Sequence, residues 1–338
     1  MMRSFNYQRA SDADFAVQAM GAEKMPPPMA QAQFLAGGTT ILDLMKLDVM
    51  RPRTLVDVND LANRYGAIEA RGDMMHLGSF VRMSEAAEHP VLQRDFPVIV
   101  QSLQFAASAQ LRNMATLGGN VLQRTRCNYF RDTSWHACNK RNPGSGCAAL
   151  QGVNRKHAVL GTSNACIATY PGDFAQALIA LDATVDIQGM NGPRVIRFEE
   201  LHVTPGDTPE RETVLSPTDL ITGFSIPINN WTRRSAYLKI RDRESYEFAL
   251  ASAAVALDLD GSTVRDVRIA LGGVATKPWR AREAEAVLKG QTISEETCAR
   301  AAEAAFATAV THGGNDYKPL LGRRVLTRAL LQVARMEA

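Results

Sequence analysis

The chain has 338 residues, 46% of them hydrophobic and 22% charged, so it is long enough for two or three folded units and too apolar to be disordered. The 38 basic and 35 acidic residues leave a net charge of +3, which is too small to indicate a nucleic-acid or membrane-surface binder. No apolar run approaches the roughly 18–20 residues of a membrane-spanning helix. The first 18 residues carry four charges and lack the apolar segment of a signal peptide. We expect a globular protein that does not insert into a membrane. If the protein is exported, another chain would have to carry the export signal.

Strand and helix patterns alternate along the first two thirds of the chain. The predicted strands occupy residues 34–36, 54–58, 67–80 (as a hairpin), 184–187 and 221–227. The predicted helices occupy residues 41–47, 83–88, 91–107 and 173–181. We expect Pro97 to break the third of these helices early, because proline lacks the N–H that a helix interior needs.

The last hundred residues form a unit of their own. Its predicted strands cover residues 236–240, 248–259 and 264–274, and its predicted helices cover residues 280–289, 294–309 and 318–336. Asp260-Gly261 joins the second and third strands and is a strong hairpin signal. Strands followed by helices indicate a small α+β domain, and residues 229–233 are predicted to be the linker before it.

Two glycine loops are candidates for phosphate binding. Gly37-Gly38-Thr39-Thr40 stands between a strand and a helix, where backbone N–H groups and two hydroxyls can hold an anion. Leu117-Gly118-Gly119-Asn120 is a second such loop, preceded by Thr116. Paired glycines usually mark tight turns, but two loops of matching chemistry suggest the two phosphates of one dinucleotide. Residues 144–149 fit a relaxed Rossmann pattern but follow no strand, so we reject them as a nucleotide site.

Groups that could catalyse a reaction by themselves are scarce in this sequence. It contains no Walker loop, no pair of histidines at metal-binding spacing and no nucleophile elbow. We therefore expect a protein whose chemistry belongs to a bound cofactor.

Four of the five cysteines fall within 40 residues, in the pattern C-x10-C-x8-C-x18-C; they are Cys127, Cys138, Cys147 and Cys166. Zinc sites favour closer pairs, disulfides need an oxidising compartment, and a [4Fe–4S] cluster needs four thiolates and tolerates irregular spacing. From the spacing alone, an iron–sulfur cluster, two disulfides, a zinc site and unrelated thiols all stay open. The fifth, Cys298, falls in a predicted amphipathic helix and is expected to be a packed thiol.

The same part of the chain is basic. Residues 124–156 hold seven lysines or arginines and one acid, Asp132. These charges could compensate an anionic thiolate cluster, dock an acidic partner, or simply form a solvated loop face, and the sequence leaves these interpretations open. No nucleic-acid-binding module surrounds them, so no nucleic-acid partner is expected.

Several runs resemble a known family. Residues 34–45 (FLAGGTTILDLM), 110–120 (QLRNMATLGGN) and 170–178 (YPGDFAQAL) resemble the FAD-binding subunit of the xanthine dehydrogenase family of molybdenum hydroxylases. Residues 236–241 and 271–280 are similar to the C-terminal flavoprotein domain of that family. The resemblance implies an α+β fold: a vanillyl-alcohol-oxidase-type (PCMH-like) FAD-binding domain of two subdomains, plus a small C-terminal α+β domain.

The resemblance also implies domain boundaries. Residues 1–228 would form the FAD-binding domain, with subdomains of about 1–60 and 61–228, and residues 233–338 would form a CO-dehydrogenase-flavoprotein-like domain. Most relatives lack the cysteine segment, about 124–168. Its presence narrows the resemblance to FAD subunits of bacterial periplasmic aldehyde oxidoreductases that carry an extra [4Fe–4S] cluster. Reductases of 4-hydroxybenzoyl-CoA have a comparable insertion and are the nearest alternative.

Site residues follow from the resemblance in the same way. The residues implied to bind FAD are Ala36, Gly37, Gly38, Thr39, Thr40, Ile41, Thr116, Gly118, Gly119, Asn120, Asp173, Ile221 and Lys239. The two loops would hold the pyrophosphate and ribityl chain through N–H and hydroxyl donors, Asp173 would bond polar groups of FAD, and Lys239 would lie near the flavin ring. Cys127, Cys138, Cys147 and Cys166 would ligate iron. Thr40 departs from relatives, which often have an amide or an acid there.

The function that the resemblance implies is electron transfer. A molybdenum-cofactor large subunit would oxidise aldehydes to carboxylic acids, and a [2Fe–2S] small subunit would pass electrons to the FAD of this chain and on to an external acceptor. The three subunits would form a heterotrimer, exported to the periplasm with a signal-bearing partner or, alternatively, retained in the cytoplasm. No catalytic residue is expected in this chain. A self-contained FAD oxidase and a cysteine-stapled scaffold protein are the other hypotheses.

Overall fold

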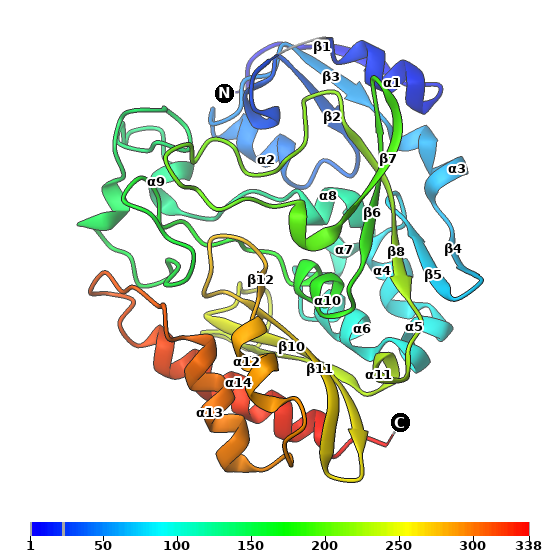
Figure 1. Ribbon diagram of the computed structural model, residues 1–338. Coiled ribbons are helices and arrows are strands. Elements are labelled where there is room, and N and C mark those ends of the chain that lie inside the picture. The colour runs from blue at the N-terminus through cyan, green and yellow to red at the C-terminus, as the bar shows by residue number, and fades with distance from the viewer. Residues whose placement is uncertain (1, 22–23, 338) are drawn as a thin grey trace.

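The computed structural model describes residues 2–21 and 24–337 and arranges them around three sheets (Figure 1). A small parallel sheet lies at the N-terminal end, a five-stranded antiparallel sheet follows, and a four-stranded antiparallel sheet carries the C-terminal helices. In the part of the chain that the structure describes, no helix has the length and apolarity to cross a membrane.

The N-terminal sheet consists of β1 (Asn6–Arg9), β3 (Thr54–Asp57) and β2 (Ala32–Leu35), in that order and all parallel. The helices α1 (Ala13–Ala19) and α2 (Ile41–Lys46) connect them. Parallel strands have their carboxyl ends at one edge of a sheet, and ligands of such sheets bind outside that edge. The first glycine loop follows β2 and therefore lies at this edge.

The second sheet has the order β4-β5-β8-β6-β7. Its strands are β4 (Ile68–Arg71), β5 (Met74–Gly78), β6 (Thr184–Gly189), β7 (Gly192–Arg197) and β8 (Leu220–Pro227). Buried residues alternate with partly exposed ones along β6, so one face of the sheet packs against helices. Those helices are α4 (Met83–Glu88), α5 (Pro90–Asp95), α6 (Pro97–Gln104), α8 (Leu117–Val121) and α10 (Phe174–Ala180), whereas α7 (Ala109–Met114) lies against α4 and buries none of its residues. The predicted break at Pro97 is confirmed, since α5 ends at Asp95 and α6 begins at Pro97.

The third sheet has the order β12-β11-β10-β9. Its inner strand β10 contributes residues to two hydrophobic cores. Its strands are β9 (Ser235–Ile240), β10 (Ala251–Asp260), β11 (Thr263–Gly272) and β12 (Trp279–Arg280). Ala254 and Ala256 of β10 pack into the core formed with α6 and α10, whereas Ala253 and Val255 pack under the C-terminal helices. Those helices are α12 (Arg282–Leu288), α13 (Glu295–Ala305) and α14 (Lys318–Ala334). Small residues on both faces of β10 let helices approach it from either side.

The remaining short elements connect these units. They are η1 (Pro27–Met29), η2 (Asn59–Leu61), α3 (Ala62–Tyr65), α9 (Asn128–Arg131), η3 (Ala148–Leu150), η4 (Phe198–Glu200) and α11 (Asn230–Arg233). The linker predicted over 229–233 is thus largely a helical turn, because Trp231 and Thr232 are buried there instead of being solvated.

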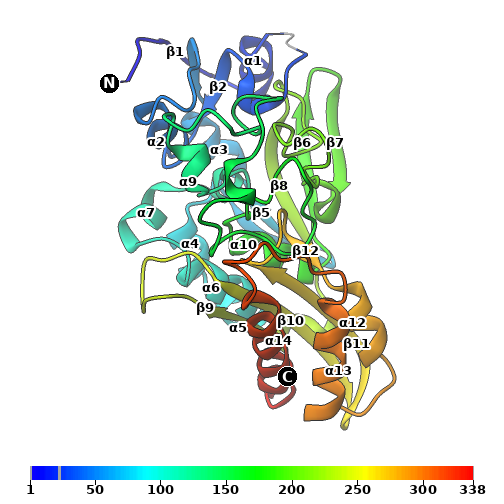
Figure 2. The same ribbon diagram turned by 90° about the vertical axis from the view of Figure 1, so that its left-hand side faces the viewer.

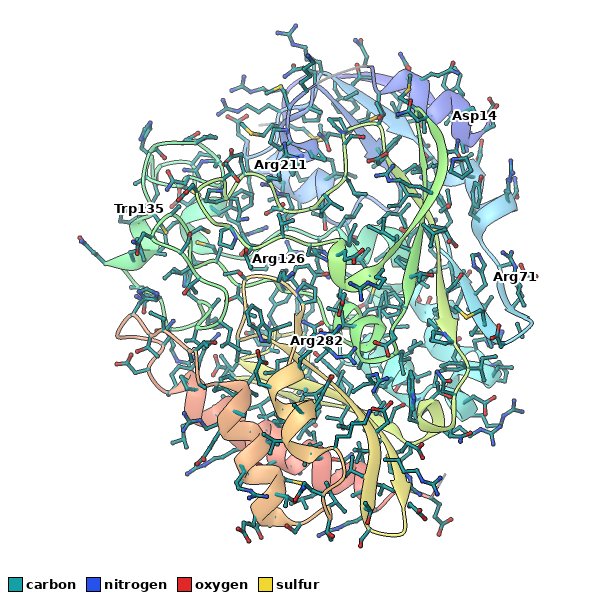
Figure 3. The ribbon with its side chains drawn as sticks, in the orientation of Figure 1. Asp14, Arg71, Arg126, Trp135, Arg211 and Arg282 are labelled. Atoms are coloured by element: carbon teal, nitrogen blue, oxygen red, sulfur yellow. The ribbon has the colours of Figure 1, made fainter. Side chains whose placement is uncertain are left out.

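The cysteine segment, residues 124–168, packs between the N-terminal lobe and the C-terminal domain (Figures 1 and 2). Arg131 donates two hydrogen bonds to Asp43 of α2, at 2.7 and 3.0 Å. Val159 donates to the carbonyl of Val274 and accepts from the N–H of Val310, both at 2.8 Å. Trp135 marks the outer edge of the segment, and Arg126 lies toward the middle of the molecule (Figure 3).

Candidate functional site

The two predicted glycine loops line one cavity, but only the first is a loop: the second, Thr116–Asn120, forms the N-cap and first turn of the short helix α8, so its prediction as a loop is corrected. The first loop contributes Ala36–Ile41, and the second contributes Thr116, Gly118 and Gly119. Ile221 of β8 lies on the same cavity, as do residues of the long connection between η4 and β8. The structure thus brings together ten of the thirteen predicted FAD-binding residues; the three outside the lining are Asn120, Asp173 and Lys239.

Glycine is required where the two loops meet. A Cβ atom on Gly37 would lie 1.9 Å from the carbonyl oxygen of Met114, and one on Gly118 would lie 3.0 Å from the Cβ of Ser79. Gly38 has a φ of +73°, which L-residues with a side chain rarely adopt. The missing side chains let Gly37 pack against Met114 and Gly118 pack against Ser79, which sets the positions of the two segments at the cavity.

The two loops offer different hydrogen-bond donors. The N–H groups of Gly38, Thr39 and Thr40 have no partner among residues 2–21 and 24–337, so they are available to an anion. In the second loop, Gly118 donates to the carbonyl of Ser79 at 2.8 Å, and Gly119 donates to the Thr116 hydroxyl at 3.1 Å. The first loop therefore supplies free N–H groups. The second supplies the Thr116 hydroxyl, because the N–H groups of its two glycines already have partners.

Asn120 lies in α8, directly after the two glycines, and its side chain has an unused acceptor. Its side-chain nitrogen donates to the sulfur of Met83 at 3.2 Å, whereas its Oδ1 is buried and has no partner among the described residues. A buried acceptor without a donor is costly, and it marks a place where a bound molecule can complete the hydrogen bonding.

Asp173 and Lys239 form a buried ion pair outside the cavity lining. Lys239 Nζ lies 2.7 Å from Asp173 Oδ2, with side chains 2% and 4% exposed. Tyr237 donates to Asp173 Oδ1 at 2.5 Å, and Lys239 also donates to the carbonyl of Phe105 at 2.9 Å. Burial raises the pKa of Asp173, and the Lys239 ammonium opposes that rise. Their contacts with FAD remain a prediction.

A second charged group, which the sequence did not single out as a site, lines the cavity. Glu212 pairs with both Arg124 and Lys140 at 2.9 Å, and all three side chains are largely buried. Burial disfavours the Glu212 carboxylate, but Arg124 and Lys140 outweigh burial and hold its pKa at about 2. Glu212 thus compensates one of the two positive charges, and the group of three keeps a net charge of +1. Glu212 has no local sequence signal, because it lies 88 residues from Arg124.

His202 also lines the cavity and was missed. Its Nε2 donates to the carbonyl of Val121 at 2.9 Å, and its ring packs edge-on against Tyr170. Burial lowers the pKa of His202 to about 4, so the imidazole is neutral at physiological pH.

The four clustered cysteines converge on a second, smaller cavity. Cys127, Cys138, Cys147 and Cys166 all line it, and all four are free thiols. Cys138 and Cys147 pair through an isolated β-bridge, and Cys166 also lines the cavity of the glycine loops. The two disulfides that the spacing left open are absent from the described structure.

The thiols are held in an apolar setting. Burial, with smaller contributions from the neighbouring thiols, raises the pKa of Cys127 to about 12 and that of Cys166 to about 11. Without a metal Cys127 and Cys166 are therefore protonated at neutral pH, and a bound metal ion would convert them to thiolates. Within the described ranges, no three His, Cys, Asp or Glu side chains have the arrangement of a metal-ion site.

The basic residues around the cysteines have partners inside the chain. Arg126 and Arg131 pair with Asp43, and Arg155 and Lys156 pair with Asp242. Arg141 donates to backbone carbonyls, including those of Tyr129 and Phe130 at 2.7 and 2.6 Å. Most of the positive charge therefore fastens the segment to the rest of the molecule.

Comparison with known proteins gives the family. Residues 3–229 match the family described as FAD binding domain in molybdopterin dehydrogenase, and residues 236–333 match the CO dehydrogenase flavoprotein C-terminal domain. The aldehyde oxidoreductase FAD-binding subunit PaoB of Escherichia coli is 43% identical over 340 residues, covering 100% of both chains. The carbon monoxide dehydrogenase medium chain of Hydrogenophaga pseudoflava is 24% identical, covering 89% of this chain and 88% of its own.

Solved structures give the same fold. In carbon monoxide dehydrogenase from Hydrogenophaga pseudoflava, a chain 24% identical in sequence superimposes with a TM-score of 0.75, covering 99% of this chain and 98% of its own. The predicted α+β fold, an FAD-binding domain followed by a flavoprotein C-terminal domain, is confirmed. The chain belongs to the family of FAD-binding medium subunits of molybdenum hydroxylases.

Proposed function

We propose that this chain is the FAD-binding subunit of a molybdenum-dependent aldehyde oxidoreductase. The observation that carries the proposal is the convergence of two glycine loops and Ile221 on one cavity. Bound FAD supplies redox chemistry that no side chain of the protein can provide. The end-to-end match with a subunit named for aldehyde oxidation supports the substrate class.

The residues of the cavity have separate roles in this proposal. The free N–H groups of Gly38, Thr39 and Thr40 bind the pyrophosphate, which carries the negative charge of the cofactor. The Thr116 hydroxyl adds a polar contact from the cavity wall, whereas Asn120 lies outside the lining and its contact with FAD stays a prediction. Glu212 offsets one of the two positive charges of Arg124 and Lys140, so the cavity lining keeps a net charge of +1 that supports the anion recognition by the backbone amides.

Partner subunits complete the enzyme. We propose that a molybdenum-cofactor large subunit oxidises the aldehyde and that a [2Fe–2S] small subunit connects it to this chain, which reacts with an external acceptor. The names of relatives, such as medium chain, support a complex of several subunits. The proposed compartment is the periplasm, reached together with a signal-bearing partner, and cell fractionation with an antibody against this chain tests it.

We further infer that Cys127, Cys138, Cys147 and Cys166 hold a [4Fe–4S] cluster. Four free thiols around one small cavity are the donor set that such a cluster uses. Each thiolate of a four-iron cluster binds a different iron, so its sulfurs stand further apart than the ligands of one ion. The absence of a single-ion ligand group among the described residues is compatible with that spacing.

Cofactor analysis of the purified chain tests both proposals. Anaerobic purification is expected to give a coloured protein with one FAD and about four iron and four sulfide per chain. Cys166→Ser is expected to lose the iron, whereas Cys298→Ser, which alters a packed thiol of α13, keeps it. A colourless preparation contradicts the FAD proposal, and a flavoprotein without iron contradicts only the cluster.

Aldehyde addition separates this proposal from a self-contained oxidase. The flavin of the isolated chain is expected to stay oxidised when an aldehyde is added anaerobically. Addition of the partner subunits should then bleach it. Bleaching of the isolated chain would instead favour an oxidase with its own substrate site.

A further inference from the structure

His157 lies directly against one of the four clustered thiols. Its Nε2 is 3.2 Å from the sulfur of Cys127, within hydrogen-bond reach of a sulfur acceptor. The side chain is 6% exposed, and its Nδ1 has no partner among the described residues. A neutral imidazole carries one N–H, and the Cys127 sulfur is the partner that the structure offers it.

The backbone on both sides of His157 is fixed by the C-terminal domain. Asn315 donates to the carbonyl of Ala158 at 3.0 Å, and Lys318 donates to the carbonyl of Lys156 at 3.0 Å. Asn154, three residues earlier, donates to the carbonyl of His312 at 2.7 Å. Asn315, Lys318 and the His312 carbonyl belong to α14 and the loop before it, so three hydrogen bonds tie the backbone around His157 to this part of the chain.

We propose that His157 donates its Nε2–H to the Cys127 sulfur and acts as a positioning residue that tunes the iron–sulfur cluster. The inference rests on the proposed cluster, in which Cys127 is a thiolate. An N–H donor withdraws electron density from a ligating sulfur and stabilises the more negative, reduced cluster. His157 therefore raises the reduction potential of the cluster and keeps the Cys127 side chain in its ligating rotamer.

Two variants of His157 test the role of the N–H. His157→Phe fills the site without a donor and is expected to lower the midpoint potential of the cluster, measured by an EPR-monitored redox titration of the full chain. His157→Gln retains a side-chain N–H and is expected to lie between His157→Phe and the wild type. His136→Phe changes an exposed histidine of the same segment and should leave the potential unchanged.

The outcomes separate this inference from the proposed cluster. A wild-type chain without iron overturns the cluster itself. Iron present in both proteins, with the same potential in His157→Phe as in the wild type, overturns only the role of His157. If His157→Phe loses its iron, pulsed EPR of the reduced wild type labelled with ¹⁵N-histidine decides: a hyperfine coupling to imidazole nitrogen supports the hydrogen bond, and its absence overturns it.

Discussion

Gly37 and Met114 lie so close that a Cβ on the glycine would stand 1.9 Å from the methionine carbonyl oxygen. Gly37 stands in the loop after β2, and Met114 is the last residue of α7, just before Thr116 and α8. Their contact fixes the separation of the two loops that line the cavity. A change at Gly37 is therefore a change in the shape of the nucleotide site.

Gly37→Ala is expected to weaken FAD binding. Forcing a methyl group against a backbone carbonyl costs roughly 1–3 kcal/mol, which corresponds to about a 5- to 150-fold loss of affinity if the loop moves out of its binding geometry. The affinity is measured by fluorescence titration of the apoprotein with FAD. Gly72→Asn is the control, because Gly72 stands in a hairpin turn with open space around it and asparagine tolerates its positive φ. Equal affinities of Gly37→Ala and the control would contradict the role of this contact.

Glu212→Gln is expected to destabilise the fold. Removing the shared carboxylate leaves Arg124 and Lys140 buried without a counter-charge, which costs about 3–5 kcal/mol. The free energy of unfolding in urea at pH 7 measures the loss. Glu303→Gln, on the exposed side of α13, should behave like the wild type.

The same carboxylate predicts a pH dependence. The pKa of Glu212 is about 2 in the fold against 4.5 for the free side chain, so the folded state binds fewer protons between these values. The stabilisation of about 3 kcal/mol is complete above pH 4.5 and is lost as the pH falls toward 2. Glu212→Gln should lack this part of the acid unfolding curve, and parallel curves for the two proteins would be evidence against it.

Local patterns sufficed to predict much of the fold. The helix α4 is marked by its helical periodicity, and the hairpin β10–β11 is marked by the turn sequence between its strands. The predicted ranges of both agree with the structure. The strands β1 and β7 were missed because they are mostly exposed edge strands, so no alternation of apolar residues marks them. The helix α1 was missed although Asp12 caps it.

The sequence likewise predicted only part of the candidate site. Two glycine loops and four cysteines are recognisable from residue type, and the structure brings each set to one cavity. Glu212 and His202 are invisible to such patterns, because each acts through a partner more than 80 residues away. Contacts of that kind depend on how the sheets pack, which no short window of sequence encodes.

His202 is expected to make the stability of the protein sensitive to mild acid. Its pKa is about 4 in the fold against 6.5 when exposed, so the unfolded chain binds the proton first. Stability therefore falls as the pH drops from about 6.5 to 4, by about 3 kcal/mol from this residue. His202→Gln should show a flatter dependence in urea unfolding between pH 7 and 4, whereas the exposed control His136→Gln should follow the wild type. A His202→Gln curve as steep as that of the wild type would rule out this residue as the source.

Lys239→Met tests the buried pair with Asp173. The Asp173 carboxylate would lose its counter-ion in a site where both side chains are almost fully buried, so the expected cost is about 3–5 kcal/mol of unfolding free energy. Lys239→Met combined with Asp173→Asn removes the uncompensated charge, and the double variant should be less destabilised than the sum of the single ones. Lys289→Met is the control, because its side chain is 67% exposed and 3.8 Å from Asp266, and it should stay close to the wild type. If the two single effects are simply additive, Asp173 and Lys239 are not energetically coupled. The charge of Lys239 would then have a role that does not depend on Asp173.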